Sequence, residues 1–425
     1  MANIASRPSP EAEPQRFLGI RLRLLLPGLL ILGLLTLLTW HQIGPDGKAL
    51  LAVTQAKRAV EQRGGTSPRT SGLHRVQPRF SGFPVNEAVN SLSQSDTNAS
   101  LLAAELIVQL KPGATNIDEI AATMNAKVTG RIPSLNAYRL EFENAAAADA
   151  ARAKLAGADE VASLDSNYSL TRPADSTLAS STATTANGLT ITPGDSNGKL
   201  VVGLIDTAVQ VASTGLDSSF FLPSLSVAGE STADANTPLH GTSMAEAILQ
   251  GVAAVNDSGA SSVRILSVDV YGNSETTSTF QVAEGIVSAI ANGATIINLS
   301  LGGDSGNSLL QQVITDAYGQ GIIFLSSAGN ESVTTATYPA AYSQVIAVTA
   351  TDASGNIASY ANYGDFVDVA APGTIVVNYN GQSYIVVGTS SATALVSGVA
   401  AGIAEKSSVT AAQVEQTIRT GLAAP

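Results

Sequence analysis

The chain has 425 residues, 44% of them hydrophobic, and no cysteine. It can bury a sizeable core in about two or three compact units, and it can form neither disulfides nor thiolate metal sites. Residues 191–425 hold 18 acidic and 4 basic side chains, a net charge of −14, so nucleic acid is not expected as a partner.

An apolar run at residues 24–40 follows Arg16, Arg21 and Arg23. Its length is near the lower limit for a helix that crosses a bilayer. We favour an uncleaved transmembrane signal-anchor, with residues 1–23 in the cytoplasm and the remainder on the extracytoplasmic side, because Trp40 suits the membrane interface. The alternative is a signal peptide that is removed, which would make the protein secreted.

Residues 41–100 are rich in Gly, Ser and Pro and lack an apolar period, which predicts a linker. Residues 101–170 instead contain strand-like and helix-like segments in the order βαββαβ, which predicts a small ferredoxin-like α+β domain. In chain order these segments are 105–110, 117–126, 127–132, 136–142, 145–157 and 161–168.

The segment at residues 171–198 is dominated by Ser, Thr, Gly and Asp. This composition predicts an exposed connector that is open to proteolysis.

From residue 199 onward, short β-branched runs alternate with helical segments. The alternation predicts a doubly wound, mostly parallel α/β sheet. The expected strands are 200–206, 263–270, 294–303, 321–330 and 344–351, and the expected helices include 279–292 and 309–320. Because chemistry in such sheets gathers at the carboxyl ends of strands, we expect Asp206, Gly303 and Asn330 near a site.

The chain has three histidines, and His41 and His74 lie in the anchor flank and the linker. Histidine chemistry in the α/β domain must therefore use His240. Ser243 would project beside His240 from the same helical turn, which is a poor geometry for a nucleophile and its base. Ser390 is the stronger candidate, because it opens a helix whose unpaired N–H groups and dipole favour an oxyanion.

Three segments, "VVGLIDTAV", "LHGTSMA" and "GTSSATALVSGVAA", resemble the Asp, His and Ser boxes of the subtilisin-like serine peptidases, in that family's order. The resemblance implies that Asp206 orients the base, His240 is the general base and Ser390 is the nucleophile. The turn "SSAGN" implies Asn330 as an oxyanion donor. The strand "INLSLGG" implies that the substrate main chain is bound by Ser300, Leu301, Gly302 and Gly303.

Residues 101–170 are similar to the inhibitor-type propeptides of the same family, through "ELIVQLKPGA" and "NAYRLEF". This similarity implies a propeptide that assists folding and blocks the active site until it is cut off. Residues 171–198 would then be the processing linker, and residues 199–425 the catalytic domain with a subtilisin-like fold.

Five positions depart from the family's usual boxes, namely Ala208, Glu246, Ser391, Ala394 and Leu395. None of them removes a side chain of the implied triad. The departures keep open a catalytically weak or inactive binding module with the same fold, and a transpeptidase would use the same acyl-enzyme as a hydrolase.

The expected function is therefore a serine endopeptidase made as a self-processing zymogen. Its expected partners are a polypeptide substrate, its own propeptide and a membrane reached through residues 24–40. The expected mechanism requires no cofactor and no catalytic metal, and structural calcium cannot be read from the sequence.

Overall fold

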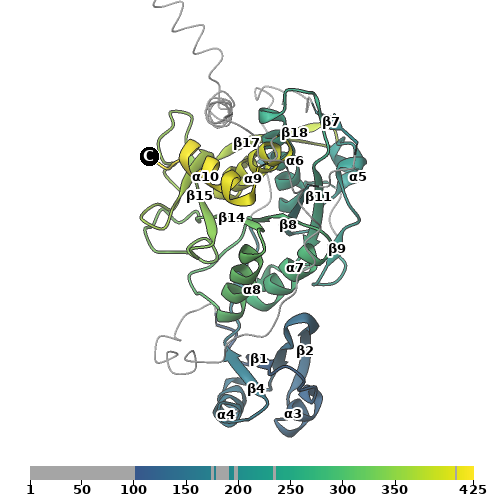
Figure 1. The fold of residues 1–425 in the computed structure, drawn as a ribbon, viewed down its shortest axis with the longest axis vertical. Coiled ribbons are helices and arrows are strands. Elements are labelled where there is room, and N and C mark those ends of the chain that lie inside the picture. Colours follow the sequence, from purple (N-terminus) through teal and green to yellow (C-terminus); the bar gives the residue numbers. More distant parts are fainter. Residues whose placement is uncertain (1–100, 174–176, 179–190, 196–199, 233–235, 407–408) are drawn as a thin grey trace, which may run out of the picture. The chain divides into compact units, whose positions relative to one another are not determined.

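The structure, a computed structural model, describes residues 101–425 except 174–176, 179–190, 196–199, 233–235 and 407–408 (Figure 1). The predicted signal-anchor at 24–40 and the linker at 41–100 lie outside the described residues. Among the helices of the described part, none is long and apolar enough to cross a bilayer.

The first described domain has the predicted βαββαβ order. Its elements are β1 (Glu105–Leu110), α3 (Ile117–Thr123), β2 (Lys127–Ile132), β3 (Ala137–Glu141), α4 (Ala145–Leu155) and β4 (Val161–Asp165). The strands form an antiparallel sheet in the order β2-β3-β1-β4. The predicted first helix is three residues too long at its end, because Asn125 adopts a positive φ of 53° that a helix cannot continue through.

The second domain is built on a seven-stranded sheet in the order β16-β15-β14-β13-β8-β11-β9. Every pairing in it is parallel, as predicted. The strands are β8 (Val201–Asp206), β9 (Leu225–Ser226), β11 (Arg264–Asp269), β13 (Ile296–Leu299), β14 (Ile323–Ser327), β15 (Val345–Thr351) and β16 (Val369–Pro372). The short edge strand β9 and the outer strand β16 were not among the predicted strands.

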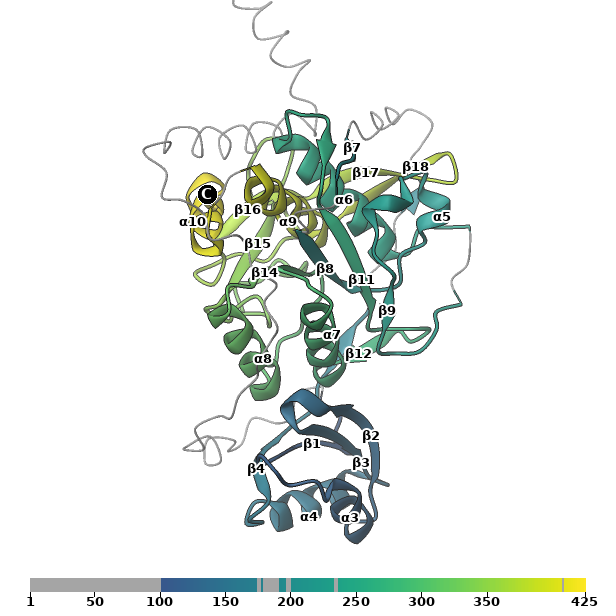
Figure 2. The same cartoon turned by 45° about the vertical axis from the view of Figure 1, so that its right-hand side comes forward.

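Helices cover both faces of this sheet (Figure 2). The four largest are α6 (His240–Val255), α7 (Thr279–Ala291), α8 (Ser308–Gly319) and α9 (Thr389–Lys406), and α10 (Ala411–Gly421) follows near the C-terminus. Successive side chains of β8 point to opposite faces. Val202 and Leu204 are buried with α6 and α9, whereas Val201 and Ile205 are buried with α7 and α8. The near-continuous apolar strands predicted from the sequence are therefore explained by burial on both sides.

A hairpin of β17 (Thr374–Tyr379) and β18 (Gln382–Val387) leads directly into α9. Its two-residue turn is Asn380-Gly381, and both residues have positive φ, 50° and 73°. This is the backbone that a tight hairpin requires. On its far side β18 pairs with the two-residue strand β6 (Thr177–Leu178), so the sheet order is β17-β18-β6 and β17 is an edge strand.

Side chains of the first domain accept hydrogen bonds from the N-terminal residues of α7 and α8. Asp165 Oδ2 accepts from the Leu309 N–H at 2.9 Å, and Asn167 Oδ1 accepts from the Phe280 N–H at 3.1 Å and the Thr279 hydroxyl at 2.9 Å. These bonds satisfy N–H groups that have no partner within their own helix. Burial raises the pKa of Asp165 above its ordinary value, and the backbone N–H bonds oppose that rise.

The chain then continues as an extended strand along the second domain. β5 (Ser169–Thr171) pairs antiparallel with β12 (Thr276–Ser278). The Tyr271 hydroxyl donates to the Thr171 carbonyl at 3.3 Å. Leu170 fills the space beside Gly303, where an added Cβ would lie 2.8 Å from Leu170 Cδ2. The strand predicted at 161–168 ends three residues earlier, at Asp165 in β4, and the next strand, β5, begins at Ser169 and pairs with the second domain.

Helices α6 and α9 cross at two glycines. A Cβ on Gly398 would clash with the Ile248 carbonyl oxygen, and a Cβ on Gly251 would clash with the Leu395 carbonyl oxygen. Because backbone lies against backbone at this crossing, neither helix can relieve a clash by moving a side chain.

We expect Gly398→Ala to lower the free energy of unfolding by about 1–3 kcal/mol, because the added methyl group forces the two helices apart. Gly319→Ala is the matched control, since it lies in α8 with no atom within 4 Å of an added Cβ. Its better helix propensity should leave stability unchanged or raise it by about 0.5–1 kcal/mol. Urea unfolding of both variants measures the difference, and equal effects would contradict the close crossing.

Candidate active site

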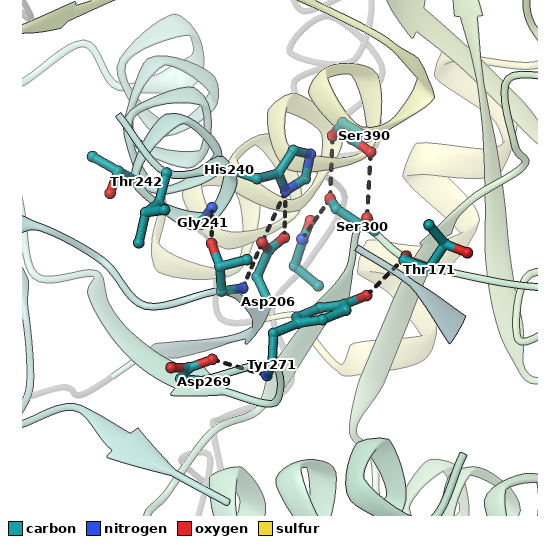
Figure 3. Close-up of polar contacts among 12 residues, drawn as sticks. Thr171, Asp206, His240, Gly241, Thr242, Asp269, Tyr271, Ser300 and Ser390 are labelled. Atoms are coloured by element: carbon teal, nitrogen blue, oxygen red, sulfur yellow. Dashed lines mark hydrogen bonds and ion pairs between the residues drawn. The ribbon is translucent and has the colours of Figure 1, made fainter. Parts of the chain in front are cut away.

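Asp206 and His240 form a buried hydrogen-bonded pair. Asp206 ends β8, His240 begins α6, and their exposed fractions are 0% and 3%. His240 Nδ1 lies 2.8 Å from Oδ1 and 2.9 Å from Oδ2 of Asp206 (Figure 3). Because a carboxylate only accepts hydrogen bonds, this contact holds the imidazole proton on Nδ1 and leaves Nε2 as the basic nitrogen.

The loop after β8 holds the start of α6 in place. The Thr207 N–H donates to Asp206 Oδ1 at 2.7 Å, and Thr207 Oγ1 accepts from the Gly241 N–H at 2.8 Å. A side chain at 241 would clash with the Thr207 carbonyl oxygen, so the close approach of loop and helix requires glycine there. This loop therefore sets both the rotamer of Asp206 and the position of His240.

Ser390 is the second residue of α9 and is 7% exposed. Its hydroxyl donates to the Ser300 carbonyl at 3.3 Å, and the Ser300 hydroxyl donates to the Ser390 carbonyl at 3.3 Å. In Figure 3 the His240 ring lies between the Asp206 carboxylate and Ser390. The structure thus brings together the three side chains that the sequence singled out.

A series of buried hydrogen bonds connects Ser300, the partner of Ser390, to the interior of the domain. Asn298 Nδ2 donates to the Ser300 hydroxyl at 2.9 Å, and the Ser397 hydroxyl donates to Asn298 Oδ1 at 2.9 Å. Asn298 and Ser397 are 0% exposed. Sequence reasoning did not select Asn298, although a single amide inside the apolar run "TIINLSL" was the available signal.

The side chain of Asn330 is oriented by the residue before Ser390. Asn330 Oδ1 accepts from the Thr389 N–H at 2.9 Å and from the Thr389 hydroxyl at 3.0 Å. With its carbonyl fixed in this way, the amide nitrogen lies on the Gly388 side, 3.4 Å from where a Cβ of Gly388 would be. Asn330 itself is exposed.

Asn362 supports the loop that carries Asn330, and it too was missed from the sequence. Its amide nitrogen donates to the Ala328 carbonyl at 2.9 Å, and its Oδ1 accepts from the N–H groups of Glu331 at 2.9 Å and Val333 at 3.2 Å. It is 0% exposed. In the sequence it is one polar residue of a loop, and nothing local marks it as buried.

The predicted substrate-binding stretch at 300–303 divides into a buried and an open half. Ser300 and Leu301 are 1% and 3% exposed, whereas Gly302 is exposed. The backbone of Gly303 is paired with Tyr338, with N–O distances of 2.9 and 2.7 Å. The N–H and carbonyl of Gly303 are therefore hydrogen-bonded to Tyr338. Gly302 is the exposed residue of this stretch.

A second carboxylate, Asp269, ends β11 in register with Asp206. Its Oδ1 accepts from the N–H groups of Tyr271 and Gly272, both at 2.9 Å. Burial, and to a smaller extent the Asp206 charge, raise the pKa of Asp269, while these N–H bonds and Arg172 oppose the rise. Negative charge is thus concentrated at the carboxyl ends of β8 and β11.

Ser243 is 0% exposed within α6. Its placement agrees with the sequence argument that it is not the nucleophile. In the part of the chain that the structure describes, no group of three or more His, Asp or Glu side chains could hold a metal ion.

Comparison with known proteins gives two family matches. The sequence model of the subtilase family matches residues 197–423, and that of the fervidolysin N-terminal prodomain matches residues 87–165. The chain is 45% identical to thermitase of Thermoactinomyces vulgaris over 144 residues, which are 33% of this chain and 52% of thermitase. It is 36% identical to subtilisin Savinase of Lederbergia lenta over 221 residues, which are 48% of this chain and 79% of that protein.

M-protease of Shouchella clausii is 36% identical over 221 residues, 48% of this chain and 56% of M-protease. The chain thus spans little more than half the length of thermitase and M-protease. Among solved structures, the epidermin leader peptide processing serine protease of Staphylococcus aureus is similar with a TM-score of 0.55 and 19% identity, over 74% of this chain and 90% of that one. At that identity the similarity concerns the fold alone.

Proposed function

Because the chain belongs to the subtilase family, we propose that it is a serine endopeptidase that hydrolyses peptide bonds through an acyl-enzyme. The observation that carries the proposal is the double contact of His240 Nδ1 with the buried carboxylate of Asp206, at 2.8 and 2.9 Å. In this proposal Ser390 is the nucleophile, His240 the general base and Asp206 the group that orients the base.

The proposed reaction begins when Ser390 Oγ attacks the substrate carbonyl carbon and His240 Nε2 accepts the hydroxyl proton. The imidazolium returns that proton to the leaving amine as the peptide C–N bond breaks, which leaves an ester on Ser390. Water then attacks the ester, again through His240, and releases the acid. Asp206 stays hydrogen-bonded to Nδ1 throughout, and its carboxylate stabilises the imidazolium.

The oxyanion would be bound by two donors. The Ser390 N–H lies in the first turn of α9, where backbone N–H groups have no partner within the helix. The Asn330 amide nitrogen is the second donor, since its oxygen is held by Thr389. The two donors lie on different elements, but the bonds from Thr389 to Asn330 Oδ1 hold the Asn330 side chain next to the start of α9, so their separation is preorganised.

The same proposal makes residues 101–170 an inhibitory propeptide. Its support is the antiparallel pairing of β5 with β12, which is how an extended peptide adds to an exposed strand. The strand covers Gly303 with Leu170 and accepts the Tyr271 hydroxyl bond at Thr171. A substrate would have to displace β5 in order to use β12.

Self-processing provides the first test. We expect a Ser390→Ala precursor to stay uncut within residues 171–198, because it lacks the nucleophile. Ser243→Ala is the matched control and should be processed normally. Mass spectrometry of the N-terminus after expression shows whether each variant has been cut. A Ser390→Ala precursor that matures when made alone would refute self-processing.

Labelling of the nucleophile distinguishes the peptidase from the alternative function, an inactive binding module. A processed sample that reacts with a serine-directed fluorophosphonate at Ser390 supports the peptidase. Peptide binding without such labelling would favour the binding module.

The role of Asn330 predicts a kinetic signature. Its bond to the oxyanion strengthens in the transition state, so Asn330→Ala should lower kcat by roughly 10² to 10³ with KM little changed. The variant must be processed in trans, because slow self-cutting would imitate inactivity. A folded, processed variant whose kcat stays within about threefold of wild type would exclude the oxyanion role, since one lost donor should cost ~3 kcal/mol.

We also propose that residues 24–40 anchor the protein in a membrane with the catalytic domain on the extracytoplasmic side. The support is the apolar run at 24–40, which has no charged residue and follows Arg16, Arg21 and Arg23. The intact precursor should resist alkaline carbonate extraction, whereas a precursor that lacks residues 24–40 should be extracted. Recovery of the intact, unprocessed chain in the soluble fraction would contradict the anchor.

A further inference from the structure

Glu246 is a buried carboxylate that the proposed mechanism does not use. It lies on α6, less than two turns after His240, and is 4% exposed. Its Oε2 accepts from the Asn378 N–H at 2.9 Å, and its Oε1 lies 3.4 Å from the Gln250 amide nitrogen. That same Gln250 nitrogen donates to the Val376 carbonyl at 2.8 Å.

These contacts occupy the free edge of β17. The opposite edge is paired with β18, so in the described part of the chain no strand lies beside the outward-facing Val376 carbonyl and Asn378 N–H. Glu246 and Gln250 replace that missing strand, one accepting and the other donating. Helix α6 is therefore attached to the hairpin by two side-chain bonds to its main chain.

The β17–β18 hairpin directly precedes Ser390, the proposed nucleophile, in the chain. β18 ends at Val387, three residues before Ser390, and the Gly388 N–H donates to the Gly373 carbonyl at 2.8 Å. Glu246 thus connects the helix that begins with His240 to the strands that lead to Ser390. We propose that Glu246 is a positioning residue that holds the β17–β18 hairpin, and with it Ser390, against α6, and that this hold weakens as the pH rises toward neutrality.

The pH dependence follows from burial. Burial raises the pKa of Glu246 from 4.5 to about 7, and the bonds from Asn378 and Gln250 oppose that rise. The elements around Glu246 carry the titratable side chains of His240, Asp206, Tyr379, Tyr384, Glu405 and Lys406. None of these charges contributes to the raised pKa of Glu246, which comes from burial.

A raised acid pKa means that the attached state binds its proton more tightly than a state in which Glu246 is hydrated. The attachment is fully stabilised below the ordinary pKa of 4.5, and this stabilisation is lost as the pH rises to about 7. Between pH 5 and 7.5 the opening equilibrium should therefore grow on the order of 50-fold. Glu246→Gln keeps an acceptor for the Asn378 N–H but cannot ionise, so its opening should not depend on pH in this way.

Hydrogen exchange of the Asn378 amide tests the attachment and needs no catalytic activity. The ratio of the exchange rates of wild type and Glu246→Gln should rise on the order of 50-fold from pH 5 to 7.5, because the intrinsic rate cancels. Glu230→Gln removes an exposed carboxylate and should give no such change. A ratio that is constant with pH, or that rises equally for amides of β15, would overturn the proposal, since the latter outcome means global unfolding.

The positioning role has a kinetic test that rests on the proposed peptidase activity. In processed enzyme at pH 6, Glu246→Ala should lower kcat about tenfold with KM nearly unchanged, because Ser390 is less well placed. Glu246→Gln should restore kcat to within about twofold. A folded Glu246→Ala enzyme with wild-type kcat would overturn the positioning role. If wild type itself is inactive, the peptidase proposal fails while the exchange result still decides the attachment.

Discussion

The backbone contact between α6 and α9 is the constraint on which the rest of the site depends. Gly251 and Gly398 allow the two helices to touch without side chains between them. One helix begins with His240 and the other with Thr389 and Ser390, so their crossing fixes the spacing of these side chains, the proposed base and nucleophile. The parallel sheet supplies Asp206 at the end of β8, which lies between β13 and β11, and the distances of the site follow from these three elements.

The sequence was informative wherever the relevant signal was local. The buried strand that ends at Asp206, the helix whose first turn holds Ser390 and the turn at Asn330 each have a short pattern. Asp206 and Ser390 lie at the expected element ends, whereas Asn330 lies three residues beyond the end of β14 at Ser327. The support groups behind them have no such pattern. Asn362 and Glu246 matter because distant backbone N–H groups reach them, which only the tertiary fold determines.

Some information in the sequence went unused. The Asn380-Gly381 pair between two apolar runs is typical of a tight hairpin, and the hairpin of β17 and β18 was not among the predicted elements. The small domain shows a different difficulty. Its element order is readable from the sequence, but Ile107 and Ile132 join the core around Phe280 of the neighbouring domain, a packing that no single-domain pattern contains.

Each end of the connector is held by its own strand. Residues up to Thr171 are paired with β12, while β7 (Thr192–Pro193) pairs with β10 (Ala260–Ser261) and the Gly194 carbonyl accepts from Arg264 Nη2 at 2.9 Å. A cut between β6 and β7 removes a covalent link and leaves the strand pairings of β5, β6 and β7 in place. If residues 101–170 act as the proposed inhibitor, this cut would change the inhibitor from a tethered group to a bimolecular ligand, whose occupancy falls with dilution. Activation would be governed by a dissociation rate and by total protein concentration, so a dilute sample would become active while a concentrated one stayed inhibited.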